Sequence, residues 1–177
     1  MFNKLFSGAV AFSILLATMS TETMAAQNGT INVTGLITSP TCQIDVNGST
    51  NATLVLPTIR TDDLPAKGKW AGKNAFTVNV TNCSDVSPDA LNIAIIRPAG
   101  ESDVSNIPVS GTAKNVAFRL ANSGAGFLSF DANTVIKPIT LTNGKGALPL
   151  DVWYYAKEMP ISAGTLSAII TFELRYK

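Results

Sequence analysis

Short runs rich in Val, Ile and Thr recur about every eight to twelve residues along most of the chain. Gly, Pro, Asn, Asp and Ser separate these runs. Because β-branched residues favour strands, the chain is predicted to be all-β, and the spacing of the runs is typical of a sandwich. The predicted strands cover residues 29–37, 42–46, 52–56, 75–82, 90–97, 116–120, 136–142, 147–156 and 166–176.

Two Asn-Gly pairs between these runs predict tight turns with positive φ, at Asn47-Gly48 and Asn143-Gly144. The second pair suits a hairpin between residues 136–142 and 147–156. Residues 57–74 contain Pro65, Gly68 and Gly72 and are expected to form the longest loop. A short helical turn is expected there or in residues 84–89.

Residues 1–26 have the layout of a secretory signal peptide. Lys4 precedes an apolar stretch over 5–19, and the segment ends in small residues, with cleavage expected after Ala25 or Ala26. The apolar stretch is shorter than the about 20 residues of a membrane span, so a retained anchor is the weaker interpretation.

Export predicts an oxidising compartment, which favours pairing the two cysteines of the sequence, Cys42 and Cys83, in a structural disulfide. A reactive thiol pair is the alternative, but the Cys-x-x-Cys spacing of redox sites is absent.

The composition argues against several classes of function. With a net charge of +1 and 14% charged residues, the chain lacks the positive electrostatic potential that would attract nucleic acid or an anionic membrane. It contains no His, the usual general base and commonest metal ligand. The remaining candidates for catalysis are Ser or Thr with Lys, or paired carboxylates such as Asp62 and Asp63. Side chains of adjacent carboxylates usually point in opposite directions. An enzyme is therefore not expected, and no cofactor is predicted.

The end of the chain alternates strictly between apolar and polar residues, apart from the apolar Ile169. This pattern predicts a strand with one buried and one wet face. The apolar positions are Leu166, Ala168, Ile170, Phe172, Leu174 and Tyr176.

Near the start of the chain, Ile31, Val33, Gly35 and Ile37 alternate with Thr30, Asn32, Thr34 and Leu36. Physical reasoning leaves open whether this strand pairs within its own domain, is a frayed arm, or adds to the sheet edge of another molecule. A glycine within a strand marks a bulge or a close approach by another group, so Gly35 is informative. Leu36 is, like Ile169, an apolar residue on the predicted outer face.

Together these features resemble the chaperone-usher pilins. The C-terminal strand has Gly164 fourteenth from the end and a penultimate Tyr176, the N-terminal arm has a central Gly35, and Cys42 precedes Cys83 by about forty residues. Residues 56–64, 76–84 and 116–120 are similar to subunits of type 1 fimbriae, and the resemblance covers essentially the whole chain after residue 26.

The resemblance implies an immunoglobulin-like sandwich that lacks one strand and is completed by donor-strand complementation. Residues 27–40 would be the donor-strand extension and 41–177 the pilin domain. Ile31, Val33 and Ile37 would fill pockets in a neighbouring subunit, and Gly35 would lie where its groove is tightest. The acceptor groove and chaperone-binding strand would involve Gly164, Leu166, Ala168, Ile170, Phe172, Leu174, Tyr176 and Lys177.

The partners implied are neighbouring pilin subunits, a periplasmic chaperone that binds the C-terminal carboxylate at Lys177, and an outer-membrane usher. The expected product is a fimbria on the Gram-negative cell surface that supports adhesion, of which this chain is a structural subunit, a component of the shaft or its linker.

Two other interpretations are weighed. A minor tip adaptor or adhesive pilin with a carbohydrate-binding surface would use Trp70, Trp153, Tyr154 and Tyr155, but Trp153 and Tyr155 alternate within a strand and are expected in the core. A secreted eukaryotic immunoglobulin-like domain would carry glycans at Asn28, Asn32, Asn51 and Asn79.

Overall fold

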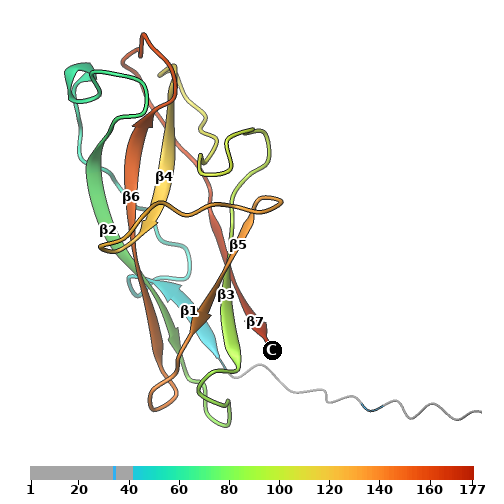
Figure 1. The fold of residues 1–177 in the computed structure, drawn as a ribbon. Coiled ribbons are helices and arrows are strands. Elements are labelled where there is room, and N and C mark those ends of the chain that lie inside the picture. Colours follow the sequence, from blue (N-terminus) through green and yellow to red (C-terminus); the bar gives the residue numbers. More distant parts are fainter. Residues whose placement is uncertain (1–33, 35–41) are drawn as a thin grey trace, which may run out of the picture. The chain divides into compact units, whose positions relative to one another are not determined.

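The computed structural model describes residue 34 and residues 42–177, and seven antiparallel strands form two sheets in this part (Figure 1). The predicted all-β fold is confirmed. The predicted signal peptide and donor-strand extension lie outside the described residues, except for the exposed Thr34. One sheet has the order β1 (Gln43–Val46), β2 (Trp70–Thr81), β6 (Gly146–Ala156), β4 (Val116–Asn122), and the other has the order β5 (Thr134–Ile139), β3 (Leu91–Ile96), β7 (Thr171–Tyr176).

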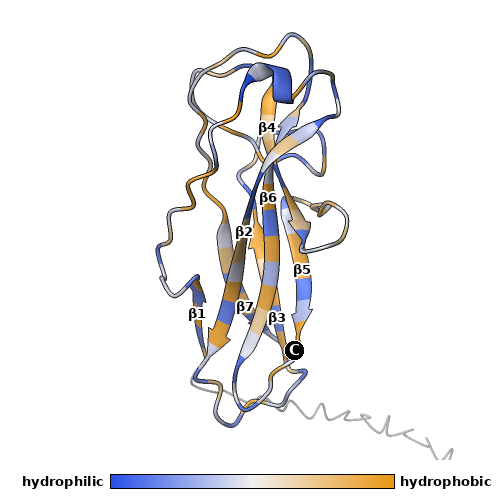
Figure 2. Ribbon diagram, turned by 90° about the vertical axis from the view of Figure 1, so that its left-hand side faces the viewer, coloured by the Kyte–Doolittle hydropathy of each residue, from blue (hydrophilic) through white to orange (hydrophobic). Residues whose placement is uncertain are grey.

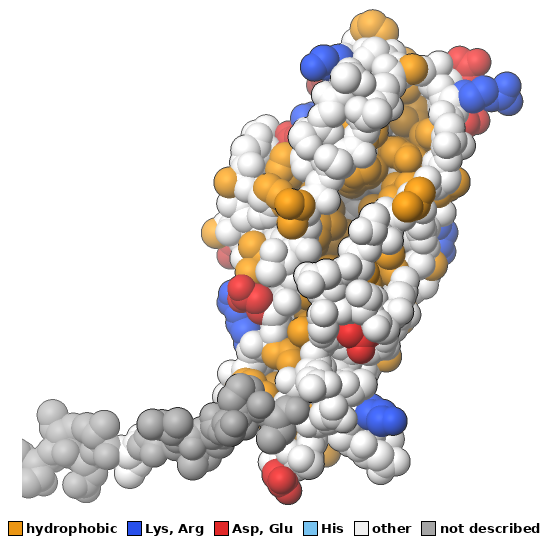
Figure 3. Space-filling view, turned by 180° about the vertical axis from the view of Figure 1, so that it is seen from behind, with side chains coloured by type: hydrophobic (Ala, Val, Ile, Leu, Met, Phe, Trp, Pro, Cys, Tyr) orange, Lys and Arg blue, Asp and Glu red, His pale blue; other side chains and the backbone are white. Residues whose placement is uncertain are grey.

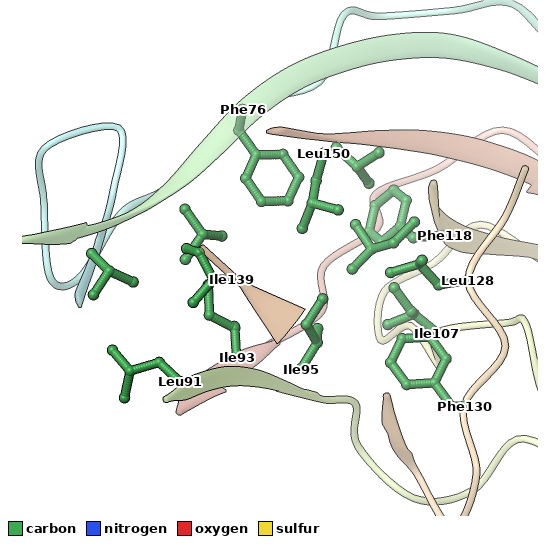
Figure 4. Packing of buried hydrophobic residues seen from close by; sticks show 14 of the residues in the cluster. Phe76, Leu91, Ile93, Ile95, Ile107, Phe118, Leu128, Phe130, Ile139 and Leu150 are labelled. Carbon is green, nitrogen blue, oxygen red and sulfur yellow. The ribbon is translucent and has the colours of Figure 1, made fainter. Parts of the chain in front are cut away.

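The core lies between the two sheets and follows from the alternation of side chains along each strand. Val78 of β2, Ile93 of β3 and Leu150 of β6 are completely buried. Figure 2 shows the alternating hydropathy along the strands, and Figure 4 shows side chains from both sheets meeting in this interior. Each such side chain contributes roughly 1.5–3 kcal/mol when it leaves water.

The predicted strand at 75–82 is longer in the structure, because β2 begins at Trp70. Its extra residues pair with the end of β6, Trp70 with Tyr155 and Asn74 with Val152. A bulge between these pairs includes Gly72, whose φ of 66° favours glycine. The helical turn expected in 57–74 is present as a 3₁₀ turn, Thr61–Asp63.

Two predicted strand segments are wrong. Residues 52–56 form no strand, although the Asn74 side chain donates a hydrogen bond to the Val55 carbonyl at 2.7 Å. Residues 166–170 also lie outside β7. The reason is that β3 ends at Ile96, which pairs with Thr171, so the residues before Thr171 have no continuing partner in that sheet.

Arg97 anchors the loop that follows β3. Its buried guanidinium donates hydrogen bonds to the carbonyls of Asp103, Asn106 and Glu101, and lies 5.2 Å from the centre of the Phe130 ring. These contacts fold the residues after β3 into a compact loop. Within the described residues, no helix is long and apolar enough to cross a membrane.

The predicted turns and disulfide are present. Asn47, Gly48, Asn143 and Gly144 all have positive φ, and Cys42 is bonded to Cys83. The flanking strands of the second turn nevertheless do not pair as a hairpin, because β5 and β6 belong to different sheets. The turn carries the chain from one sheet to the other.

The expectation that Trp153 and Tyr155 are core residues is wrong. Val152 is buried in the core and Tyr154 packs against it, so the alternation directs Trp153 and Tyr155 to the outer face. Cations lie over both rings there, with Lys73 Nζ 5.7 Å from the Trp153 centroid and Arg119 Cζ 3.3 Å from that of Tyr155. This arrangement lets large rings occupy a sheet surface without filling the interior.

Candidate functional site

The candidate site is a groove of about 840 Å³ between residues 44–56 and residues 166–172. Figure 3 shows hydrophobic side chains gathered in an elongated hollow on this side of the molecule. The floor of the groove consists of core side chains from β2, β4 and β6, namely Phe76, Phe118, Leu120, Val152 and Tyr154.

The groove exists because the sandwich is open along one side. β7 is the last strand of its sheet and pairs only with β3, so its other edge has no ladder partner among the described strands. β1 is likewise the end strand of the other sheet. Side chains that a further strand would cover are therefore only partly buried, among them Ile44, Leu54, Ile170 and Phe172.

The predicted C-terminal residues divide into two groups. Leu166, Ala168, Ile170 and Phe172 line the groove. Leu174 packs against the core beyond the lining, while Tyr176 is 42% exposed and the Lys177 backbone N–H donates to the Ala90 carbonyl at 2.9 Å. Ile31, Val33, Gly35 and Ile37 of the predicted donor strand lie outside the described residues.

Gly164 lies beside the groove wall and does not line it. A Cβ at this position would come within 2.4 Å of the Ala113 backbone nitrogen. The same close approach allows Thr112 and Ala113 to donate backbone hydrogen bonds to the Thr165 carbonyl at 3.0 and 3.2 Å. Gly164 thus permits residues 162–167 to lie against residues 110–114, which fixes the start of this wall.

Sequence reasoning missed the opposite wall and the floor. Ile44, Val46, Leu54 and Leu56 face Leu166 to Phe172 across the groove. The spacing of Leu54 and Leu56 on either side of Val55 is the signal for this wall in the sequence, but by itself it predicts only one more strand. The floor residues belong to strands that look like ordinary core strands in the sequence.

Tyr154 marks one end of the floor. Its ring packs against Phe118, with centroids 5.5 Å apart, and a Cβ on Gly72 would come within 2.5 Å of it. Burial raises the pKa of the Tyr154 hydroxyl above its ordinary value of 10.0.

The groove offers an apolar binding surface, and its lining residues do not include a set of side chains suited to catalysis. Of its lining only Asp45 has an ionisable acidic side chain, which accepts hydrogen bonds from Gly48 and Asn79. The described residues contain no group of His, Cys, Asp or Glu that could hold a metal ion. Asp62 and Asp63 lie apart from the groove, in the 3₁₀ turn, where Asp63 accepts a hydrogen bond from the Arg60 N–H at 2.7 Å.

Comparison with known proteins gives consistent matches. The model of the family described as "Fimbrial protein" matches residues 31–177. The chain is 27% identical to the S-fimbrial protein subunit SfaA of Escherichia coli O6:K15:H31, over 98% of each chain. It is 28% identical to the type-1 fimbrial protein subunit of Serratia marcescens, over 93% of this chain and 95% of that protein.

A solved structure has the same fold. The P pilus rod subunit PapA superposes with a TM-score of 0.63 at 17% identity, covering 78% of this chain and all of that chain.

Proposed function

The chain belongs to the fimbrial protein family, and on this premise we propose that it is a structural subunit of a fimbrial shaft or its linker, joined to its neighbours by donor-strand exchange. Members of this family are non-enzymatic pilin subunits of the surface fimbriae of Gram-negative bacteria, where they polymerise with other subunits.

The observation that carries the proposal is the apolar groove beside an unpaired strand edge. An extended segment can add to such an edge by backbone hydrogen bonds while alternate side chains fill pockets. We assign this role to residues 27–40, with Ile31, Val33 and Ile37 in the pockets of the next subunit and Gly35 at the tightest point. Residues 1–26 are then the signal peptide and 41–177 the pilin domain.

The same groove calls for a chaperone before assembly. An open apolar edge invites aggregation, so a periplasmic chaperone that lends a strand and an outer-membrane usher that exchanges it are the partners proposed. Because each subunit gives its arm to one neighbour and receives an arm from another, the contacts do not close and the product is an open polymer.

Replacing Gly35 with Trp tests the proposal. The side chain cannot enter the groove, so the chaperone-bound subunit is expected to accumulate and fibres to be absent from the cell surface by electron microscopy. Asn32→Trp is the matched control, because alternation along the proposed donor strand would direct its side chain away from the groove, and this variant is expected to assemble. Normal fibres from Gly35→Trp would show that the arm is misassigned.

A minor adaptor or adhesive pilin with a carbohydrate-binding surface is the second candidate, favoured by the outer face of the β1-β2-β6-β4 sheet. Trp70 is 51% exposed there and packs edge-on against Phe127, with centroids 5.4 Å apart. Immunogold labelling of native fibres separates the candidates, because a shaft subunit labels the whole length and a tip component labels one end. Loss of glycan binding in Trp70→Ala would support the second.

A further inference from the structure

The two walls of the groove each carry one large apolar side chain that faces away from the interior. Val55 and Ile169 are both 79% exposed, although both belong to segments that line the groove. Exposing two branched aliphatic side chains on opposite rims leaves apolar surface in water. In the proposed function, the inward-facing side chains of the inserted strand fill the groove beneath these two residues and do not cover them.

The arm itself has one matching exception. Its outward positions are Thr30, Asn32, Thr34 and Leu36, of which only Leu36 is apolar. A strand between two walls lies about 4.8 Å from each, and side chains on the same face of neighbouring strands contact one another. Leu36 is therefore the arm residue suited to lie between Val55 and Ile169.

On the basis of the proposed function, we propose that Leu36 of one subunit packs between Val55 and Ile169 of the next and forms an apolar clamp over the outside of the joint. The occupant is thus the arm of a second copy of this chain. Its Leu36 adds a contact on the solvent side to those made inside the groove by Ile31, Val33 and Ile37.

Val55 and Ile169 lie at similar positions along the length of the groove, as this placement requires. Val55 is hydrogen-bonded through its carbonyl to Asn74, which pairs with Val152 on the groove floor. Ile169 lies three residues before Phe172, whose ring is 6.1 Å from that of Phe76, and Asn74 lies two residues before Phe76 in β2.

An arm antiparallel to the 166–172 wall, with Leu36 beside Ile169, puts Ile37 next to Ala168 and Gly35 next to Ile170. Each larger side chain then faces a smaller one, as close packing requires.

The test uses fibres from cells that produce the full chain with its chaperone and usher. Leu36→Thr, Ile169→Thr and the double variant are all expected to assemble, because the groove contacts remain. Each single variant is expected to dissociate in guanidinium about five- to tenfold faster than wild type. The double variant is expected to dissociate no faster than Leu36→Thr alone, because the Leu36–Ile169 contact is lost in all three variants.

Ile136→Thr is the matched control, since Ile136 is a 44% exposed isoleucine on β5, the edge strand of the three-stranded sheet that lies opposite β7. Its fibres are expected to dissociate at the wild-type rate. The clamp is overturned if Ile169→Thr matches this control, or if the effects of Leu36→Thr and Ile169→Thr multiply. Either outcome leaves donor-strand exchange intact as long as Gly35→Trp blocks assembly, whereas assembly of Gly35→Trp removes the proposed function itself.

Discussion

The two edge strands of the three-stranded sheet, β5 and β7, differ in how far their residues discourage pairing with a further strand. β5 contains Lys137 and Pro138, and both residues discourage further pairing, one by its charge and the other by its missing N–H. β7 contains no proline, and its charged residues, Glu173 and Arg175, come after residues 166–172, which line the groove and are uncharged. The sheet therefore protects one edge from other chains and leaves the other edge open above an apolar groove.

Charge placed at each edge gives the largest expected contrast. In Ile170→Lys an ammonium group enters the groove, and an incoming strand would have to bury it, so fibre assembly is expected to be lost. Ile136→Lys adds the same charge to the exposed side of β5 and is expected to assemble normally. Electron microscopy of the cell surface and a fibre ladder on denaturing gels measure both. If Ile170→Lys and Ile136→Lys assembled fibres to the same extent, the proposed difference between the β5 and β7 edges would be wrong.

The sequence predicts the closed part of this molecule better than its open part. β3 and β6, which have a neighbour on each side, are predicted to within one residue, and so is the part of β2 that lies between β1 and β6, because apolar alternation and two ladder partners favour the same structure. At 52–56 and 166–170 the alternation is broken only by Val55 and Ile169, but the ladder partner is missing from the described chain. Local pattern cannot reveal that a neighbouring strand is absent.

The phase of alternation also limited the prediction at β6. Trp153 and Tyr155 are predicted as core residues because they alternate within a strand, but the buried face of β6 is the one that carries Val152. The C-terminal wall of the groove was predictable from its own alternation. The opposite wall and the floor were not, because they come from segments far apart in the sequence that meet only in the folded sandwich.

The wall opposite the 166–172 segment begins next to the disulfide, which joins Cys42, just before β1, to Cys83, just after β2. Replacing both cysteines with Ala is expected to lower the free energy of unfolding of the arm-filled subunit by about 4 kcal/mol, because the unfolded chain regains the entropy of a 41-residue separation. Guanidinium unfolding measures this, with wild type under reducing conditions as the control. An unchanged midpoint would mean that the groove wall is held by packing alone.

A smaller change separates the open and closed parts of the core. Phe172 is partly exposed in the groove and meets Phe76 edge-on at 6.1 Å, whereas Ile93 is fully buried. Phe172→Ala is expected to lower the free energy of dissociation of subunits from the fibre by about 3 kcal/mol, since the inserted strand would complete the burial of this ring. Ile93→Ala is expected to reduce the yield of the chaperone-bound subunit as well. If Phe172→Ala and Ile93→Ala reduced the yield of the chaperone-bound subunit equally and weakened the fibres equally, the open and closed parts of the core would not differ.

The smallest expected effect is an alkaline one at the end of the groove floor. Burial raises the pKa of Tyr154 above 10.0, so the unfolded chain loses this proton first and the stability of the fold declines as the pH rises from about 10 through the raised value. Tyr154→Phe is expected to remove this part of the decline, and Tyr176→Phe, at an exposed position, serves as the control. Because Tyr154 lines the groove, an inserted arm would bury it further and displace its titration to still higher pH. Absorbance of tyrosinate in fibres and in dissociated subunits measures that displacement, and its absence would mean that the arm does not reach this end of the groove.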